Sequence, residues 1–185
     1  MKKSLISLIF VVAATCSCTS ASNKQGQEAA ESSLETVESS MDTLESLSAE
    51  EATEAPDFTL NDINGQPLKL SSLRGKYVIL DFWGSWCVWC IKGMPKMKEY
   101  YQKYAGKFEI LGIDCNDPEE KWKAAVAKYE LPWLHVYNTD DSGVLEQYAI
   151  QGFPTKIIVG PDGKIVKTII GEDPAFYTLL DKLFK

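Results

Sequence analysis

The sequence has a deficit of basic residues and almost no histidine. Its 19 Lys and Arg are outnumbered by 26 Asp and Glu, which gives a formal net charge of −7 at pH 7. Neutralising phosphates requires clustered basic side chains, so nucleic acid is excluded as a partner. There is one histidine, His135, and no second Cys-x-x-Cys pair that could complete a four-ligand zinc site with Cys87 and Cys90.

The N-terminal apolar stretch is too short to span a membrane. Residues 5–14 amount to roughly 10, whereas a spanning helix needs ~20. Together with the two lysines before it, this stretch predicts an export signal. A cysteine follows at once, which resembles the lipobox of bacterial lipoproteins. Residues 1–18 are therefore predicted to be a lipoprotein-type signal peptide with Cys18, or alternatively Cys16, as the lipidated residue. Cleavage after Ala21, giving a soluble exported protein, is the other interpretation.

An acidic segment without aromatic residues follows the signal. Residues 19–55 contain a single Lys, and residues 28–54 carry nine carboxylates and no basic residue. A segment of this composition cannot bury enough apolar surface to offset the entropy of ordering. We therefore expect a flexible tether rich in Ser and Glu. Apolar residues in 34–47 recur at helical spacing, so a transient helix or a weak self-association seam is the alternative.

The remaining residues, 56–185, are expected to form one folded domain. It begins with a β-hairpin around Asn64-Gly65, a dipeptide typical of tight turns. Asp117 is expected to cap a helix that has Pro118 in its first turn. Alternating strands and helices that end in a hairpin and a helix predict an α/β fold, a three-layer sandwich around a mixed central sheet. The predicted strands are 57–60, 66–70, 77–83, 108–113, 134–137, 155–159 and 165–170, and the predicted helices are 87–104, 118–129, 144–149 and 174–184.

Two cysteines stand where the strand at 77–83 gives way to the helix at 87–104. Residues i and i+3 share one face of a helix, so the sulfurs of Cys87 and Cys90 can meet without distorting the backbone. Cys87 would sit at the helix N-terminus, where free N–H groups and the macrodipole favour a thiolate. The thiolate is the attacking species in disulfide exchange, and Cys90 can then resolve the mixed disulfide. The spacing therefore predicts a redox pair.

Metal-binding interpretations of the pair remain open. Cys115 and His135 could in principle join the two cysteines in a zinc site. The two thiols with His135 could instead bind copper, as in a protein that delivers this metal. Otherwise we expect Cys115 to be a buried small apolar residue and His135 to fill space in a strand.

The run from Asp81 to Cys90 resembles the active-site segment of the thioredoxin superfamily, and it is most similar to the exported branch of ResA-like and TlpA-like proteins. Residues 55–76 resemble the N-terminal hairpin extension of that branch. Residues 152–155, Gly-Phe-Pro-Thr, resemble the cis-proline loop, and Pro95 matches the proline that kinks the active-site helix. The resemblance covers the whole predicted domain and implies a thioredoxin-like thiol–disulfide oxidoreductase with an N-terminal β-hairpin extension.

The resemblance implies a role for each matching residue. Cys87 would attack and Cys90 would resolve, with Asp81 as the buried acid that shuttles protons to the second cysteine. A buried carboxylate has a raised pKa, which suits this task near neutrality. Pro154, in cis after Phe153, would pack against the pair and leave the polar groups of Phe153 free for a substrate strand. No cofactor is implied beyond the Cys87–Cys90 disulfide.

Three tryptophans surround the pair. Among Trp83, Trp86 and Trp89 we expect one in the core and one or two on the surface, where Trp86 and Trp89 would receive an unfolded substrate. Trp89 also precedes the second cysteine, a position where thioredoxin-like reductants commonly carry proline. The dipeptide between the cysteines tunes the reduction potential, which ranges from about −270 to about −120 mV in this superfamily. We interpret the protein as a reductase, with a disulfide oxidant or isomerase as the alternative.

The expected partners follow from the signal and the resemblance. Thiols and disulfides of exported proteins would be the substrates, apocytochrome c among them, and a membrane thiol carrier would supply electrons. The protein would act as a monomer, anchored by lipid on the periplasmic side of a bacterial membrane. A peroxiredoxin, which shares the fold, needs a Pro-x-x-x-Ser/Thr-x-x-Cys run. Leu80 and Gly84 occupy the first two of these positions before Cys87, so peroxidase activity is not expected.

Overall fold

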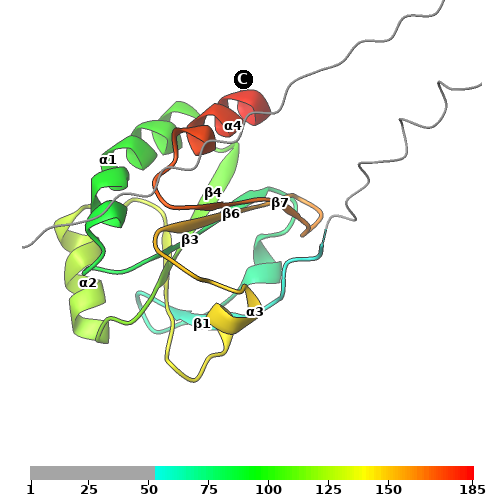
Figure 1. Cartoon of the computed structure of the whole chain (residues 1–185). Helices are drawn as coiled ribbons and strands as arrows, with labels where there is room; N and C mark the ends of the chain where they lie inside the picture. Colours follow the sequence, from blue (N-terminus) through cyan, green and yellow to red (C-terminus); the bar gives the residue numbers. More distant parts are fainter. Residues whose placement is uncertain (1–52) are drawn as a thin grey trace, which may run out of the picture. The chain divides into compact units, whose positions relative to one another are not determined.

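The computed structural model describes residues 53–185 of the chain (Figure 1). The predictions of a signal peptide at 1–18, a lipidated Cys18 or Cys16, a helical stripe at 34–47 and most of the acidic tether lie outside the described residues. Within residues 53–185, no helix has both the length and the apolar character required to cross a bilayer.

A seven-stranded mixed sheet forms the centre of the fold. In space the strands follow the order β2-β1-β5-β4-β3-β6-β7. β4 is parallel to both β3 and β5, and every other pairing is antiparallel. This arrangement confirms the predicted mixed sheet. The strands are β1 (Thr59–Asp62), β2 (Pro67–Lys69), β3 (Tyr77–Trp83), β4 (Phe108–Asp114), β5 (Leu134–Tyr137), β6 (Thr155–Val159) and β7 (Ile165–Ile170).

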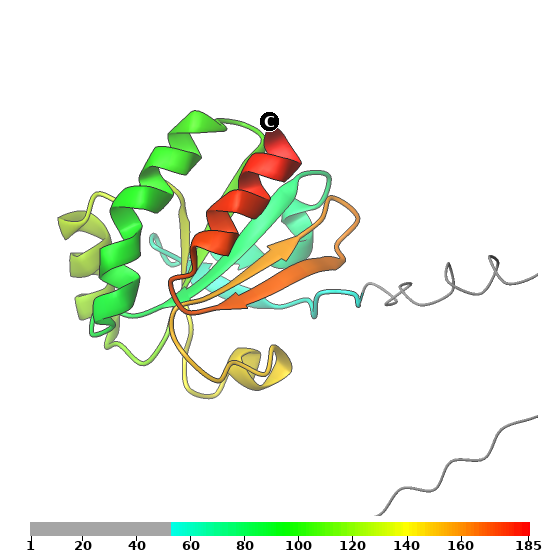
Figure 2. The ribbon, with the colours of Figure 1, turned by 45° about the horizontal axis from the view of Figure 1, so that its top comes forward.

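Helices cover the sheet on both faces, which makes the predicted three layers (Figures 1 and 2). α1 (Val88–Lys103) and α4 (Pro174–Phe184) lie side by side over one face. α2 (Glu119–Lys128) contributes Trp122 to the same apolar cluster. α3 (Val144–Gln147) and the 3-10 turn η1 (Leu70–Leu73) contribute to the apolar cluster on the opposite face. The redox pair lies in the first of these layers, at the start of α1.

The central strand β3 has apolar side chains on both faces, as expected for a strand buried between two layers. Because side chains alternate along a strand, Leu80 and Phe82 enter the cluster under α3, whereas Ile79 and Trp83 enter the cluster under α1. Asp81 lies between Ile79 and Trp83 and therefore shares their face. β3 in this way places the Asp81 carboxylate inside the layer that holds the two cysteines.

The first strand of the N-terminal hairpin lies two residues later than predicted, whereas the second, Pro67–Lys69, falls within the predicted range, and side-chain hydrogen bonds explain the difference. The Asp57 carboxylate accepts the N–H of Ser71 at 2.9 Å, which holds residue 57 outside the strand. Asp62 Oδ1 accepts the N–H groups of Asn64 and Gln66, both at 2.8 Å. The turn is therefore organised by Asp62, and β1 extends to that residue.

The predicted N-cap of α2 is wrong. The helix begins at Glu119 with Pro118 as the N-cap residue, and no side chain caps it. The Asp117 carboxylate instead accepts hydrogen bonds from the N–H and the hydroxyl of Ser85, in the loop before the redox pair. Ser85 lies 32 residues earlier in the chain. Its two donors occupy the carboxylate that was expected to bind the N–H groups of the helix.

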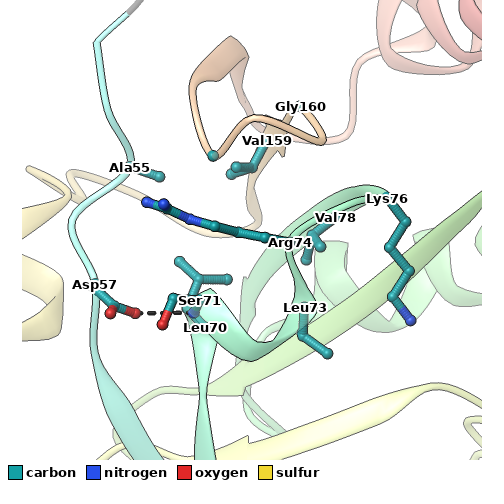
Figure 3. A pocket seen from close by; sticks show the side chains of 11 residues that line it. Ala55, Asp57, Leu70, Ser71, Leu73, Arg74, Lys76, Val78, Val159 and Gly160 are labelled. Carbon is teal, nitrogen blue, oxygen red and sulfur yellow. Dashed lines mark hydrogen bonds between the residues drawn. The ribbon is translucent and has the colours of Figure 1, made fainter.

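Backbone contacts of the described chain begin at Thr53, three residues ahead of the expected domain start at residue 56. The Ile165 N–H donates to the Thr53 carbonyl at 2.8 Å, and the Ala55 N–H donates to the Gly163 carbonyl at 2.9 Å. Arg74 forms an ion pair with Glu54. Figure 3 shows the Arg74 side chain extended past Val159, with its guanidinium end toward Ala55. The N-terminal segment is therefore attached to the β6–β7 turn.

Candidate active site

The two cysteines of the predicted pair form a disulfide at the junction of β3 and α1. The S–S distance is 2.05 Å and the Cα–Cα distance is 5.3 Å. Cys87 is the N-cap residue of α1, and its sulfur accepts the N–H of Cys90 at 3.1 Å. An N–H group at a helix N-terminus stabilises negative charge on the sulfur it contacts. Cys87 is therefore the cysteine that the local structure prepares as a thiolate.

The loop before Cys87 is fixed by contacts to the end of β4. The Cys115 N–H donates to the Trp83 carbonyl at 2.8 Å, and the Trp86 indole N–H donates to the Cys115 carbonyl at 2.9 Å. A Cβ at Gly84 would lie 2.8 Å from that carbonyl oxygen and 2.4 Å from the Trp86 indole nitrogen. Only glycine fits between these two groups, so Gly84 sets the path of the chain into the redox pair.

An apolar surface surrounds the disulfide. Trp86 is 48% exposed and Trp89 is 62% exposed, whereas each cysteine is only 5% exposed. The Trp86 ring packs edge-on against Phe153, with ring centroids 5.3 Å apart. The Phe153–Pro154 peptide bond is cis, as the resemblance implied. Trp86, Trp89 and Phe153 thus lie around the pair as expected, and exposed Val88 extends the same apolar surface.

Asp81 is buried below the pair, and its environment raises its pKa. The residue is 4% exposed. Burial raises the pKa of its carboxyl to about 6, an effect that the Lys156 ammonium opposes and the Glu172 carboxylate reinforces. The direction agrees with the predicted behaviour of a buried acid. Such a carboxyl can take up and release a proton near neutral pH.

Sequence reasoning missed Lys156 and Glu172, which accompany Asp81. Lys156 pairs in register with Asp81 on the neighbouring strand β6, and it is 2% exposed. The segment Ile157–Val159 after it is apolar on both faces. A lysine in such a central strand has no route to solvent, and this pattern was the signal available in the sequence. Glu172 lies in the turn between β7 and α4 and gave no such signal.

Cys115 and His135, the two other candidate metal ligands, are both buried. Burial raises the pKa of the Cys115 thiol. Burial also lowers the pKa of His135 to about 4, so the ring is neutral at pH 7. The His135 ring packs against Trp83 and Trp133. Among residues 53–185, no three His, Cys, Asp or Glu side chains are grouped as metal ligands.

Four features together define the class of the protein. They are the mixed sheet, the disulfide at the start of helix α1, the buried acid Asp81 and the cis-proline Pro154. This class is the thiol–disulfide oxidoreductases with a thioredoxin-like fold.

Comparison with known proteins supports the same class. The profile of the AhpC/TSA family matches residues 52–168. The chain is 39% identical over 120 residues to the thiol-disulfide oxidoreductase ResA of Bacillus cereus, an alignment that spans 64% of this chain and 69% of the relative. It is 34% identical over 125 residues to ResA of Bacillus subtilis, spanning 67% and 69%. A crystal structure of the thioredoxin domain of a thiol-disulfide oxidoreductase from Bacteroides vulgatus superposes with a TM-score of 0.65 at 35% identity, covering 71% of this chain and 96% of that chain. The chain belongs to the AhpC/TSA family, and its matched relatives are thiol–disulfide oxidoreductases.

Proposed function

We propose that this protein reduces disulfide bonds in exported proteins through the Cys87–Cys90 pair. One observation carries this proposal. The Cys87 sulfur accepts the Cys90 N–H at 3.1 Å at the start of α1, and a buried acid, Asp81, lies in the same layer. The pair therefore has an attacking sulfur, a resolving sulfur and a proton acceptor. The relatives that are named thiol-disulfide oxidoreductase support the same chemistry.

The proposed reaction has two exchange steps. The Cys87 thiolate attacks one sulfur of the client disulfide, which forms a mixed disulfide and releases the other client sulfur as a thiolate. The Cys90 thiol then loses its proton and attacks the Cys87 sulfur. This step closes the Cys87–Cys90 disulfide and releases the second client thiolate. Two electrons pass from the pair to the client, and the released thiolates each take up a proton from the medium or from a protein acid.

Asp81 is proposed to accept the proton of Cys90 in the second step. Its carboxyl has a pKa of about 6, raised by burial. At neutral pH it is therefore mostly ionised but binds a proton readily, which suits a general base for a buried thiol. In the opposite half-reaction, when Cys90 leaves as a thiolate, protonated Asp81 would return the proton.

The client is proposed to bind on the apolar surface beside the pair. Trp86, Trp89, Phe153 and Pro154 would contact an unfolded segment on either side of its cysteine. Aromatic side chains provide large contact areas for such segments at little conformational cost. Apocytochrome c is one client that fits this scheme, since it presents cysteines in an unfolded chain.

The proposed setting is the periplasmic side of a bacterial membrane. The predicted lipoprotein signal, with Cys18 or Cys16 as the anchor, would tether a monomeric domain there, and a membrane thiol carrier would return the pair to the dithiol state. This cycle needs no cofactor other than the disulfide itself.

The reduction potential of the pair tests the proposed direction of electron flow. The full chain would be equilibrated in dithiothreitol or glutathione redox buffers, and the dithiol fraction would be measured by thiol labelling and mass spectrometry. A potential at or below about −250 mV, near that of thioredoxin, is expected for a reductase. A potential between about −180 and −120 mV, in the range of isomerases and strong oxidants, would contradict the proposal and identify a disulfide donor.

A further inference from the structure

A lysine is fully buried below the redox pair. Lys156 is 2% exposed, and lysine is almost never buried to this extent unless it is paired. Its ammonium lies 2.9 Å from Glu172 Oε2 and 4.0 Å from Asp81 Oδ1. The nearer contact is a hydrogen bond and the farther one is not. Asp81 Oδ1 has no hydrogen-bond partner among residues 53–185. The lysine is thus bound to one acid and held away from the other.

Glu172 is itself held in place from two sides. The Tyr177 hydroxyl donates to Glu172 Oε1 at 2.7 Å. On the other side the carboxylate packs against Gly93 of α1, where a Cβ would lie 2.3 Å from Glu172 Oε2. Gly93 and Cys90 are both buried, three residues apart on α1, so they share a helix face. The Lys156–Glu172 pair therefore lies one helical turn from the resolving cysteine.

Among Asp81, Lys156 and Glu172, only Lys156 carries a positive charge. The position of its ammonium therefore decides how strongly the ionised form of Asp81 is stabilised. An unpaired ammonium in contact with Asp81 would keep that acid ionised. Without the ammonium, burial alone would keep the acid protonated. Glu172 fixes an intermediate arrangement, since it binds the ammonium directly and leaves Asp81 a longer, weaker contact.

We infer that Lys156 and Glu172 are positioning residues for the proton transfer between Asp81 and Cys90, with Glu172 holding the Lys156 ammonium away from Asp81. This inference rests on the proposed role of Asp81. Neither residue contacts the reacting sulfurs or the client; both act by setting the proton affinity of Asp81.

The other titratable groups around Asp81 come from every element packed against it. α1 provides Cys87 and Cys90, which are joined in a disulfide. β4 leads into Cys115, and α4 provides Tyr177; each of these groups feels the Asp81 charge, and burial raises the pKa of both, so they are neutral at pH 7. β4 also provides Asp114 on the face that Asp81 shares, and β5 provides His135 over Gly112, the register partner of Asp81. Burial raises the pKa of Asp114 to about 8 and lowers that of His135 to about 4, so both are mostly neutral at pH 7. Among residues 53–185 of the oxidised protein, Lys156 and Glu172 are therefore the charged groups that face Asp81 at neutral pH.

The test measures the titration of Asp81 directly in the full-length protein. Aspartate labelled with 13C at the side-chain carboxyl would be observed by NMR between pH 3 and pH 10, with Asp81→Asn used to assign the signal. Glu172→Gln is expected to lower the Asp81 midpoint, because the lysine becomes free to contact it. Lys156→Met is expected to raise the midpoint, and a shift of about 1–3 pH units is typical for one nearby charge. Glu120→Gln, an exposed acid on α2, is the control and should leave the midpoint unchanged.

Opposite shifts in the two variants support the inference. Unchanged midpoints, or shifts of both variants in the same direction, would overturn it, since a merely structural pair gives no such pattern. Because the Glu172 charge by itself also raises the pKa of Asp81, Glu172→Gln would be repeated in a Lys156→Met background, or in Lys156→Gln if Lys156→Met does not fold. A lowering of the Asp81 midpoint that is much smaller without the lysine supports the inference, and an equal lowering in both backgrounds would overturn it.

A parallel assay separates this inference from the proposed function. The rate of the Cys90 resolving step would be followed against pH with a preformed mixed disulfide on Cys87. Both the proposed role of Asp81 and the inference hold if Asp81→Asn removes the pH-dependent limb of this rate profile and Glu172→Gln and Lys156→Met shift the limb in opposite directions. If Asp81→Asn leaves the limb in place, the proposed role of Asp81 fails and the inference fails with it. If Asp81→Asn removes the limb but the variants do not shift it, the inference alone fails.

Discussion

At the scale of single residues, one hydrogen bond distinguishes the two cysteines. The sulfur of Cys87 accepts the N–H of Cys90, whereas Cys90 lies one turn inside α1. A thiolate on Cys87 would keep this N–H contact and the favourable end of the helix dipole. The asymmetry that exchange chemistry requires is therefore present in the backbone before any client binds.

The cysteine roles can be tested by trapping. We expect Cys87→Ser to lose exchange activity almost completely, because Cys90 is deeper in the helix and lacks the N–H contact. Cys90→Ser should still attack but should accumulate the mixed disulfide with the client, since the resolving thiol is missing. Non-reducing electrophoresis and mass spectrometry would detect the adduct. An adduct on Cys90 in the Cys87→Ser protein would reverse the assignment.

Asp114 offers a pH-dependent test of stability at a residue outside the proposed chemistry. It is fully buried, and burial together with the nearby Asp117 raises its pKa from 3.8 to about 8. An acid with a raised pKa in the folded state favours folding while it is protonated in both states, below about pH 4. That contribution is lost progressively as the pH rises from about 4, near the unfolded pKa, to about 8, the folded pKa, because over this range the unfolded state binds fewer protons than the folded one.

We therefore expect Asp114→Asn to gain stability relative to the parent protein as the pH rises. The two proteins should unfold similarly at pH 4, and the variant should be more stable at pH 9 by on the order of 2–5 kcal/mol. Urea unfolding at both pH values measures this difference. Asp140→Asn, at an exposed position, is the matched control and should show no pH-dependent gain. A constant difference at both pH values would refute the assignment.

At the scale of elements, Gly93 connects helix α1 to the Lys156–Glu172 pair. Alanine in place of glycine inside a helix normally stabilises it by about 0.5–1 kcal/mol. At this position the added methyl group would overlap the Glu172 carboxylate, which would have to leave the buried lysine. Separating a buried ion pair costs more than the helix gains.

We expect Gly93→Ala to destabilise the protein by roughly 1–3 kcal/mol in spite of its higher helix propensity. In a Glu172→Ala background, which removes the obstructing carboxylate, the same substitution should stabilise by the usual increment. Thermal and urea unfolding of the four proteins in this cycle measure the coupling. Equal effects of Gly93→Ala in both backgrounds would show that the contact with Glu172 does not matter.

The sequence predicts elements well where one simple pattern decides them. β3, β5, β6 and β7 have the predicted bounds, because each is a run of apolar or β-branched residues between turn signals. Prediction was less successful where a polar side chain bonds to a distant part of the chain. The sequence predicts Asp117 as the N-cap of α2, but both of its carboxylate oxygens accept hydrogen bonds from Ser85, 32 residues away. Such long-range pairings leave no periodic trace in the sequence.

The candidate site shows the same division. The pair, the buried acid and the cis-proline were predictable because they belong to contiguous motifs. Lys156 and Glu172 were not, because their positions matter only once β6 lies beside β3 and the β7–α4 turn reaches α1. A lysine in an apolar central strand was a visible anomaly, but its partner could not be identified before the fold was known.

At the scale of the whole molecule, the large exposed apolar residues of the described part of the chain, residues 53–185, are concentrated near the redox pair and along β7. Trp86, Val88 and Trp89 belong to the first group, and Val166 and Ile170 belong to the second. Ile170 pairs with Thr155 next to the cis-proline, whereas Val166 lies toward the other end of β7. Scattered exposed apolar residues are common, but a contiguous group indicates a binding surface.

We expect Trp89→Ala to slow exchange with an unfolded protein disulfide by roughly 3–30-fold, as for loss of an aromatic anchor at a binding surface. The rate with a small disulfide such as oxidised glutathione should change little, because that substrate does not span the surface. Stopped-flow measurements with both substrates give the two rates. Val166→Ala, an exposed apolar residue away from the pair, is the control. An equal loss with both substrates would indicate damage to the chemistry instead of to client binding.

The attachment of the N-terminal segment to the β6–β7 turn has a consequence for how the domain is oriented. Thr53 and Ala55 bond to Ile165 and Gly163 of the β6–β7 turn, which the register of β6 on β3 places at the end of the sheet opposite to Cys87. Figure 1 shows the β6–β7 turn and the start of α1 at different ends of the sheet. The seven residues of β3 separate these two ends by roughly 20 Å, at about 3.3 Å per residue. Any support joined to the chain ahead of residue 53, whether a membrane, a bead or an electrode, would therefore hold the domain by the pole remote from the disulfide. Such a support would therefore not cover the redox surface, and clients could reach the disulfide without a rearrangement of the domain.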